Sequence, residues 1–170
     1  MNVIPDLTTT CLFLPELMLI VFATFIAVAG AFRPMPKWWP IFAGLVYVAV
    51  LGVALVELRL AMTPGAPPVS GPLAIDYFGQ LLRPFALLVG LLFTVMMARG
   101  SSEELVSERM SLVMLTVLGL MVIARANDLV FLFLGLELVS IPTYALLYLG
   151  RRAATTGEAT VKYFFLSIFS

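Results

Sequence analysis

Long apolar runs separated by short polar connections form the main pattern of the chain. An α-helix satisfies its own backbone polar groups, and roughly 20 apolar residues in helix cross a bilayer core about 30 Å thick. Five runs fit this template and a sixth begins near the end. The predicted spans are residues 12–32, 38–56, 77–97, 110–124, 129–149 and 159–170. The pattern predicts an all-α fold, a polytopic transmembrane helix bundle of about five full spans plus the start of a sixth.

The last run stops inside an apolar stretch. Residues 159–170 make up about half a span and lack the interfacial or capping residues that complete one. We therefore expect the 170 residues to be a single membrane domain, the N-terminal part of a longer protein. The one long connection, residues 62–72, contains four Pro and two Gly. These residues disfavour helix, so this segment is expected to be an extramembrane loop.

The distribution of Lys and Arg predicts the orientation, because positive residues are retained on the cytoplasmic side of a membrane. The N-terminus and the second and fourth connections hold only Arg59 and Arg125. The first, third and fifth connections hold six, namely Arg33, Lys37, Arg99, Arg109, Arg151 and Arg152. The N-terminus is therefore predicted to lie outside.

Composition agrees with a membrane environment and limits the chemistry. Hydrophobic residues make up 62% of the chain and charged residues 12%, against roughly 45–50% and 25% in soluble domains. Ten Lys and Arg balance ten Asp and Glu, so no net field attracts nucleic acid. The chain has no His and one Cys, Cys11. The usual ligands of haem, iron–sulfur clusters and zinc are missing, and no cofactor or metal is expected on this chain.

Glu137 is the main candidate for chemistry. It lies eight residues into the fifth run, about 12 Å along a helix, close to the predicted midplane. A charged residue there costs roughly 2.5–3.5 kcal/mol on insertion scales, so it needs a functional reason or a structural one. Ser140 and Tyr144 follow on the same helical face, and this stripe could hold water or a cation beside a carboxyl that relays protons. The structural alternative is a permanently protonated, hydrogen-bonded packing residue.

Lys162 is the second candidate, one turn into the sixth run. Two orientations are open. Its ammonium could point inward, pair with Glu137 and exchange a proton, or it could extend to the interface.

Other charged residues near span ends have simpler interpretations. Arg83 follows Asp76 by two helical turns and is expected to anchor the third helix at the interface. Glu16 is shallow enough to reach headgroup water at a helix entry. Arg125 and Asp128 flank a short turn and are expected to form an interfacial ion pair.

Small residues recur in the fourth and fifth runs, among them Gly119 and Gly135. Small side chains let membrane helices approach closely. We expect close helix contacts at these positions, which fits a polytopic bundle in general and does not identify a function.

Two sequence blocks carry a resemblance to a known family. Residues 127–146 read NDLVFLFLGLELVSIPTYAL, and residues 158–164 read EATVKYF. Both resemble the N-subunit family of proton-pumping NADH-quinone oxidoreductase (respiratory complex I), one of its antiporter-like membrane subunits. The related M and L subunits and cation/proton antiporter subunits typically place Trp or Phe beside the same Glu. Here Leu136 and Leu138 flank Glu137, and SIPTY follows, which favours the N type.

The resemblance implies a function for the complete protein. In that family the Glu of the fifth helix and the Lys of the sixth are thought to belong to the proton channel, and they match Glu137 and Lys162. Ser140, Tyr144 and Arg83 are supporting candidates. The chain would be part of an NADH:quinone oxidoreductase subunit, translocating protons in step with quinone reduction. Family members have fourteen helices, with further channel lysines beyond this sequence, so the residues here form at most half of a path.

The resemblance also implies location and partners. The expected place is the bacterial inner (plasma) membrane, as a multi-pass protein beside other membrane subunits of complex I. NADH, FMN, iron–sulfur clusters and quinone would be bound on or between other subunits. Three alternatives stay open: a cation/proton antiporter subunit without a redox partner, a non-pumping scaffold subunit, and a truncated gene product.

Overall fold

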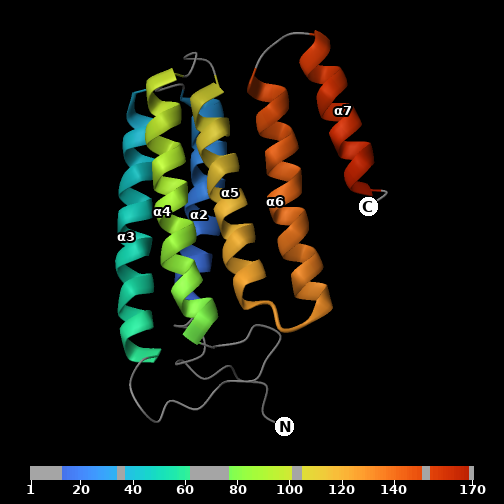
Figure 1. Cartoon of the computed structure of the whole chain (residues 1–170). Coiled ribbons are helices and arrows are strands. Elements are labelled where there is room, and N and C mark those ends of the chain that lie inside the picture. Colours follow the sequence, from blue (N-terminus) through green and yellow to red (C-terminus); the bar gives the residue numbers. More distant parts are fainter. Residues whose placement is uncertain (1–12, 34–36, 62–76, 101–104, 151–153, 169–170) are drawn as a thin grey trace.

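A computed structural model describes residues 13–33, 37–61, 77–100, 105–150 and 154–168. Within these residues six helices run side by side along a common direction (Figure 1). Their bounds are α2 Leu14–Phe32, α3 Trp38–Ala61, α4 Tyr77–Gly100, α5 Val106–Arg125, α6 Leu129–Gly150 and α7 Ala154–Ile168. The all-α prediction is confirmed. The proline-rich 62–72 segment lies outside the described residues.

Local sequence explains where α2 begins and ends. Pro15 occupies the first turn, where its missing N–H costs no helical hydrogen bond. The helix stops at Arg33, whose φ of −135° and ψ of 92° are extended. Pro34 follows in the sequence and disfavours helical geometry in the residue before it.

Three helices differ from the predicted spans by four or five residues at one end. The helix α3 continues past Val56 to Ala61, α5 begins at Val106 instead of residue 110, and α7 begins at Ala154 instead of residue 159. The hydropathy template ended the spans at charged or polar residues. Helices continue through such residues when the side chains find partners or reach the surface, so apolar length alone underestimates them.

The helix α5 is the centre of the bundle. It packs against α2, α3, α4 and α6, whereas α7 packs on α6. One face of α5 is buried along its length by Met110, Met114, Val117 and Met121, at the spacing of an apolar helical stripe. The facing core side chains are Leu19, Ala23 and Ile26 of α2, Ala43, Tyr47, Val50 and Ala54 of α3, and Leu87 of α4.

The outer faces of the helices are apolar, as expected for contact with lipid. Large side chains such as Val21, Phe85 and Val130 are 61%, 69% and 68% exposed. Contiguous apolar surface of this extent is rare on soluble monomers. Among the described residues, five helices, α2 to α6, are long and apolar enough to cross a membrane. The chain is a multi-pass membrane protein.

The α5–α6 contact depends on two glycines. A Cβ atom on Gly119 would lie 2.8 Å from the backbone nitrogen of Val139 and 2.9 Å from the carbonyl oxygen of Gly135. A Cβ atom on Gly135 would lie 3.1 Å from the backbone nitrogen of Ile123. The predicted close approach at these positions is confirmed, because any larger residue would push the helices apart.

Candidate functional site

Glu137 lies in the middle of α6 and is half-buried. It stands eight residues after the start of the helix at Leu129, or about 12 Å along its axis. It follows Gly135, the residue at which α6 touches α5. No hydrogen bond or ion pair joins Glu137 to another described residue. A carboxyl group therefore sits near midspan without a fixed partner in this part of the chain.

Ser140 and Tyr144 share the face of α6 that carries Glu137, and both are half-buried. The ring of Tyr144 packs edge-to-face against Phe164 of α7, with 6.1 Å between ring centroids. Because Tyr144 contacts α7, the face of α6 that carries Glu137 is directed toward α7. The hydroxyl groups of Ser140 and Tyr144 lie on this face within two helical turns of the Glu137 carboxyl.

Lys162 points away from α6. Its Nζ forms a salt bridge of 3.1 Å to Oε1 of Glu158, and both side chains are about 70% exposed, at 71% and 69%. Phe164, two residues further on, faces α6, and two residues turn a helix by about 200°. The inward pairing of Lys162 with Glu137, one of the two predicted orientations, is therefore not the arrangement seen here.

Arg83 is the centre of a buried charged cluster. Its Nη1 donates to Oε2 of Glu57 and to Oε1 of Gln80, both at 2.6 Å, and its Nη2 donates to Oε2 of Glu16 at 2.7 Å. The residue is fully buried. Its expected role as an interfacial anchor beside Asp76 is wrong, because the guanidinium faces α2 and α3 inside the bundle. Asp76 itself lies outside the described residues.

Glu16 and Arg125 extend the cluster to α5. Arg125 Nη1 donates to Glu16 Oε1 at 3.2 Å, and its guanidinium carbon lies 4.9 Å from the centroid of the Phe13 ring. The two residues are 6% and 2% exposed, so the expected solvated Glu16 is wrong. The expected interfacial Arg125–Asp128 pair is also wrong, since Arg125 is buried against Glu16. Asp128 is exposed and accepts a hydrogen bond from the Val130 amide at the start of α6.

Glu57 was missed by the sequence analysis because the predicted second span stopped one residue before it. Its buried position repeats the helical spacing of Val50 and Ala54 on the core face of α3. A second signal was available. Since spans alternate in direction, the starts of the first and third and the ends of the second and fourth lie at one end of the bundle. The four residues Glu16, Arg83, Glu57 and Arg125 all occupy such places in the sequence.

We refer to Glu16, Glu57, Arg83 and Arg125 as the charge quartet. Its formal charges sum to zero and alternate along the chain of contacts from Glu57 through Arg83 and Glu16 to Arg125. Removing one member of a buried ion pair typically costs about 3–5 kcal/mol, because an uncompensated charge is left in an apolar interior. The quartet is therefore a unit whose members depend on one another.

At the opposite end of the bundle, Arg109 of α5 binds the end of α6. Its Nη2 donates to the backbone carbonyl of Leu149 at 2.7 Å. Carbonyls in the last turn of a helix have no helical partner, and a cation there also interacts favourably with the helix dipole. Arg109 thus fixes the second end of the α5–α6 contact.

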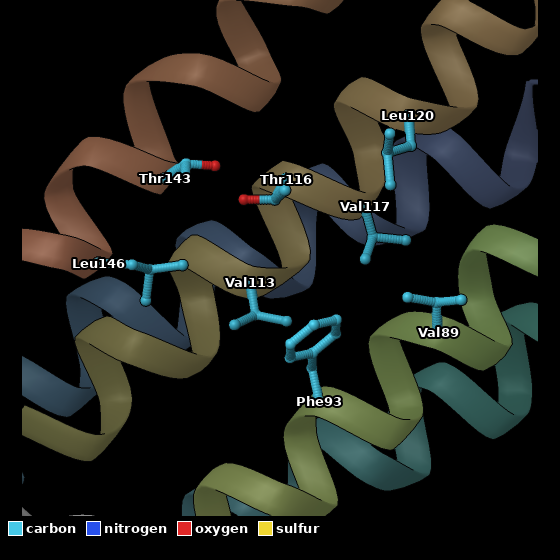
Figure 2. A pocket seen from close by; sticks show the side chains of 8 residues that line it. All are labelled: Val89, Phe93, Val113, Thr116, Val117, Leu120, Thr143 and Leu146. Atoms are coloured by element: carbon cyan, nitrogen blue, oxygen red, sulfur yellow. The ribbon is translucent and has the colours of Figure 1, made fainter. Parts of the chain in front are cut away.

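An apolar groove of about 200 Å³ lies between α4, α5 and α6. Figure 2 shows the hydroxyls of Thr116 and Thr143 pointing toward one another from α5 and α6, with Phe93 of α4 on the far side. Each hydroxyl donates to a carbonyl of its own helix, Leu112 and Val139 respectively. The lining contains no ionisable side chain. This groove is separate from Glu137, which lies on another face of α6.

No group of three or more His, Cys, Asp or Glu residues that could hold a metal ion occurs in the described part of the chain.

Comparison with known proteins gives consistent similarities. A sequence model of the family described as "NADH:quinone oxidoreductase/Mrp antiporter, TM" matches residues 126–170. Among curated proteins, the chain is 35% identical over 130 residues to NADH-quinone oxidoreductase subunit N of Gemmatimonas aurantiaca, covering 75% of this chain and 24% of that protein. It is 31% identical over 160 residues to subunit N of Methylobacterium nodulans, covering 92% and 33%.

A third relative, subunit N of a Mycobacterium species, is 33% identical over 148 residues, covering 84% of this chain and 30% of the relative. The chain thus spans a quarter to a third of the length of the curated relatives that it matches. The matched family region begins at the α5–α6 turn and includes both Glu137 and Lys162.

Proposed function

The chain belongs to the N-subunit family of NADH-quinone oxidoreductase, and from this premise we propose that it forms part of a proton-translocating subunit in the membrane arm of that enzyme. Its role there is to move protons across the membrane as quinone is reduced elsewhere in the complex. The observation that carries the proposal is Glu137, a half-buried carboxyl near the middle of a membrane-spanning helix without a fixed partner among the described residues.

The proposed chemistry is proton exchange at the Glu137 carboxyl. An ionisable residue at midspan is energetically costly, so its presence there indicates a function. A carboxyl without a fixed ion pair can change protonation with little rearrangement of its neighbours. Ser140 and Tyr144 supply hydroxyls on the same helical face, which can donate or accept hydrogen bonds along a short water path. A change in nearby charge alters the proton affinity of Glu137 and drives loading from one side and release to the other.

Lys162 enters the proposal as a second proton-path residue through the family resemblance. Its ammonium is paired with Glu158 on the exposed face of α7. An exposed i, i+4 ion pair is worth only about 0.3–0.5 kcal/mol. A small change in the surroundings of α7 can therefore release Lys162 to act in the path. Arg83 supports the path indirectly, since its contacts join it to Glu16 and Glu57.

The remaining parts of the enzyme belong to other chains in this proposal. NADH, flavin, iron–sulfur clusters and quinone are bound by or between other subunits, and those membrane subunits are the partners of this chain. The proposed location is the bacterial inner membrane, with the quartet end of the bundle facing outside, as the distribution of Lys and Arg favours.

The test is proton pumping by the assembled complex in inverted membrane vesicles, with Glu137→Gln introduced into the subunit. We expect quinone reduction with little or no accompanying acidification of the vesicle lumen. Thr143→Val is the matched control, because Thr143 lies on another face of α6 and its hydroxyl donates only within its own helix. Normal pumping by Glu137→Gln in a fully assembled complex would refute the role of Glu137.

A cation/proton antiporter subunit is the second candidate, favoured by the family description, which includes Mrp antiporters. It would use the same intramembrane carboxyl without a redox partner. Affinity purification of the native protein separates the two functions. Recovery together with quinone-reducing activity supports the N-subunit function, whereas recovery with cation/proton exchange alone supports the antiporter. If the chain is a non-pumping scaffold subunit, the complex that carries Glu137→Gln should assemble and pump normally.

A further inference from the structure

The charge quartet joins four helices at one end of the bundle. Glu16 belongs to α2, Glu57 to α3, Arg83 to α4 and Arg125 to α5. The three salt bridges, at 2.6, 2.7 and 3.2 Å, run through side chains that are at most 8% exposed. Proton exchange at Glu137 does not by itself explain why these four residues are buried together. Four ionisable residues buried together in a membrane bundle need a purpose of their own.

Arg125 is the member of the quartet that lies closest to α6 along the chain. It is the last residue of α5, and the turn at residues 126–128 leads directly into α6. Within this turn the Ala126 amide donates to the Ile123 carbonyl at 3.2 Å, and the Asp128 carboxyl caps the start of α6. The Arg125–Glu16 salt bridge therefore holds the end of α5, and the start of α6 follows after three intervening residues.

The helix α5 is also the main support of α6. The helix α6 packs chiefly on α5 and only weakly on α7, and at Gly119 and Gly135 the two helices leave no room for a Cβ atom. Glu137 is two residues beyond Gly135. A displacement of α5 relative to α2, α3 and α4 would therefore carry Glu137 with it, because the glycine contact leaves the two helices no room to slide independently.

We propose that the charge quartet is a positioning device for Glu137: its salt bridges lock α5 to the other three helices, and α5 sets the place of the Glu137 carboxyl in the membrane. Arg125 and Glu16 are the positioning residues closest to the α5–α6 turn. The inference rests on the proposed function for the meaning of Glu137, although the positioning itself is a property of the fold.

The balance of charge makes the device testable. Loss of one member changes the formal charge of the quartet by one unit, whereas loss of an oppositely charged pair keeps that charge at zero and leaves the other pair in place. Glu16→Gln with Arg125→Gln keeps the Arg83–Glu57 salt bridge, which is 2.6 Å long. Glu57→Gln with Arg83→Gln keeps the Arg125–Glu16 salt bridge.

The experiment compares Arg125→Gln with the balanced double variant Glu16→Gln/Arg125→Gln in the assembled complex. Two readouts are used. The first is the amount of assembled complex. The second is the infrared carboxyl band of Glu137, recorded as a function of pH and identified by its loss in Glu137→Gln. We expect Arg125→Gln to lower assembly, to shift the band and its pH profile, and to reduce pumping per quinone about tenfold, because small misplacement of a reacting group is costly. The double variant should restore all three.

Two results would overturn the proposal. One is an unchanged Glu137 band and pH profile in assembled Arg125→Gln complex, which would reduce the quartet to a device for stability alone. The other is a shift of the same size in the balanced double variant. If Arg125→Gln does not assemble at all, Arg125→Lys keeps the charge and supplies the comparison. Failure of the proposed function would look different: Glu137→Gln would pump normally while the band shift in Arg125→Gln persisted.

Discussion

Ionisable residues are arranged differently in the α2–α5 bundle and in the outer pair of helices α6 and α7, which we call the α6–α7 layer. In the bundle, Glu16, Glu57, Arg83 and Arg125 are buried and joined by salt bridges across four helices. In the layer, Glu137 has no partner among the described residues, and Lys162 pairs with its own helix at the surface. Burial follows the same division, since 28–61% of the residues in the spanning parts of α2 to α5 are buried, against 11% in α6.

This difference separates two uses of charge in a membrane. Mutually neutralised charges hold helices in place, because breaking any one pair leaves an unpaired charge in an apolar interior. A carboxyl without a fixed ion pair is free to gain and lose a proton. The paired charges of the bundle therefore suit a structural role, and the unpaired carboxyl of the layer suits proton exchange. The same type of substitution should therefore lower stability more in the bundle than in the layer.

The largest effect is expected for Arg83→Gln. It leaves the carboxylates of Glu16 and Glu57 close together and short of one cation, and should lower the free energy of unfolding by about 3–5 kcal/mol. Thermal unfolding of the detergent-solubilised complex measures it. Arg59→Gln is the matched control, since Arg59 is exposed near the same end of the bundle, and surface changes stay within about 0.5 kcal/mol. Equal losses for the two variants would contradict the comparison.

A smaller effect is expected where the bundle meets the layer. Gly119→Ala places a Cβ atom 2.8 Å from the Val139 backbone nitrogen, and the helices must separate, at a cost of about 1–3 kcal/mol. Gly52→Ala is the control, because a Cβ atom there meets nothing within 4 Å. It should stabilise the helix by up to about 1 kcal/mol. The same unfolding measurement serves for both, and a stable Gly119→Ala protein would show that α6 is not held through this contact.

Glu137→Gln should change stability little, within about 0.5 kcal/mol, because no ion pair is broken and no buried charge is left behind. Glu57→Gln is the same substitution in the bundle and should be much more destabilising, since it leaves Arg83 undercompensated. Melting temperatures of the two variants, measured side by side, test this contrast. A similar loss in both would mean that Glu137 is a packing residue.

The smallest effect is expected for Lys162→Gln. Its exposed salt bridge to Glu158 contributes only about 0.3–0.5 kcal/mol, and salt should screen that contribution. A double-mutant cycle with Glu158→Gln, measured at low and high ionic strength, gives the coupling energy. A coupling energy well above 1 kcal/mol that does not fall with salt would show that the pair is buried in the assembled protein, as the salt bridges of the quartet are.

Much of the fold was predictable because the physics is local. A helix in lipid must be long and apolar, so the spans could be read from run length, and Gly119 and Gly135 marked a close contact through their missing side chains. The midspan place of Glu137 was predictable for the same reason. Helix ends were less predictable. The template stopped at Val56 and residue 110, whereas the helices continue through Glu57 and Arg109, whose side chains have partners in the fold.

The sequence by itself determined the membrane-spanning helices and the depth of Glu137. Only the tertiary structure decided which charges meet. Arg125 pairs with Glu16, 109 residues away, and Arg83 with Glu57 and Glu16, although near neighbours in sequence had been expected. The physical reason is that depth in a membrane follows from position along one helix, whereas a salt bridge requires the relative rotation and contact of two helices, which long-range packing alone fixes.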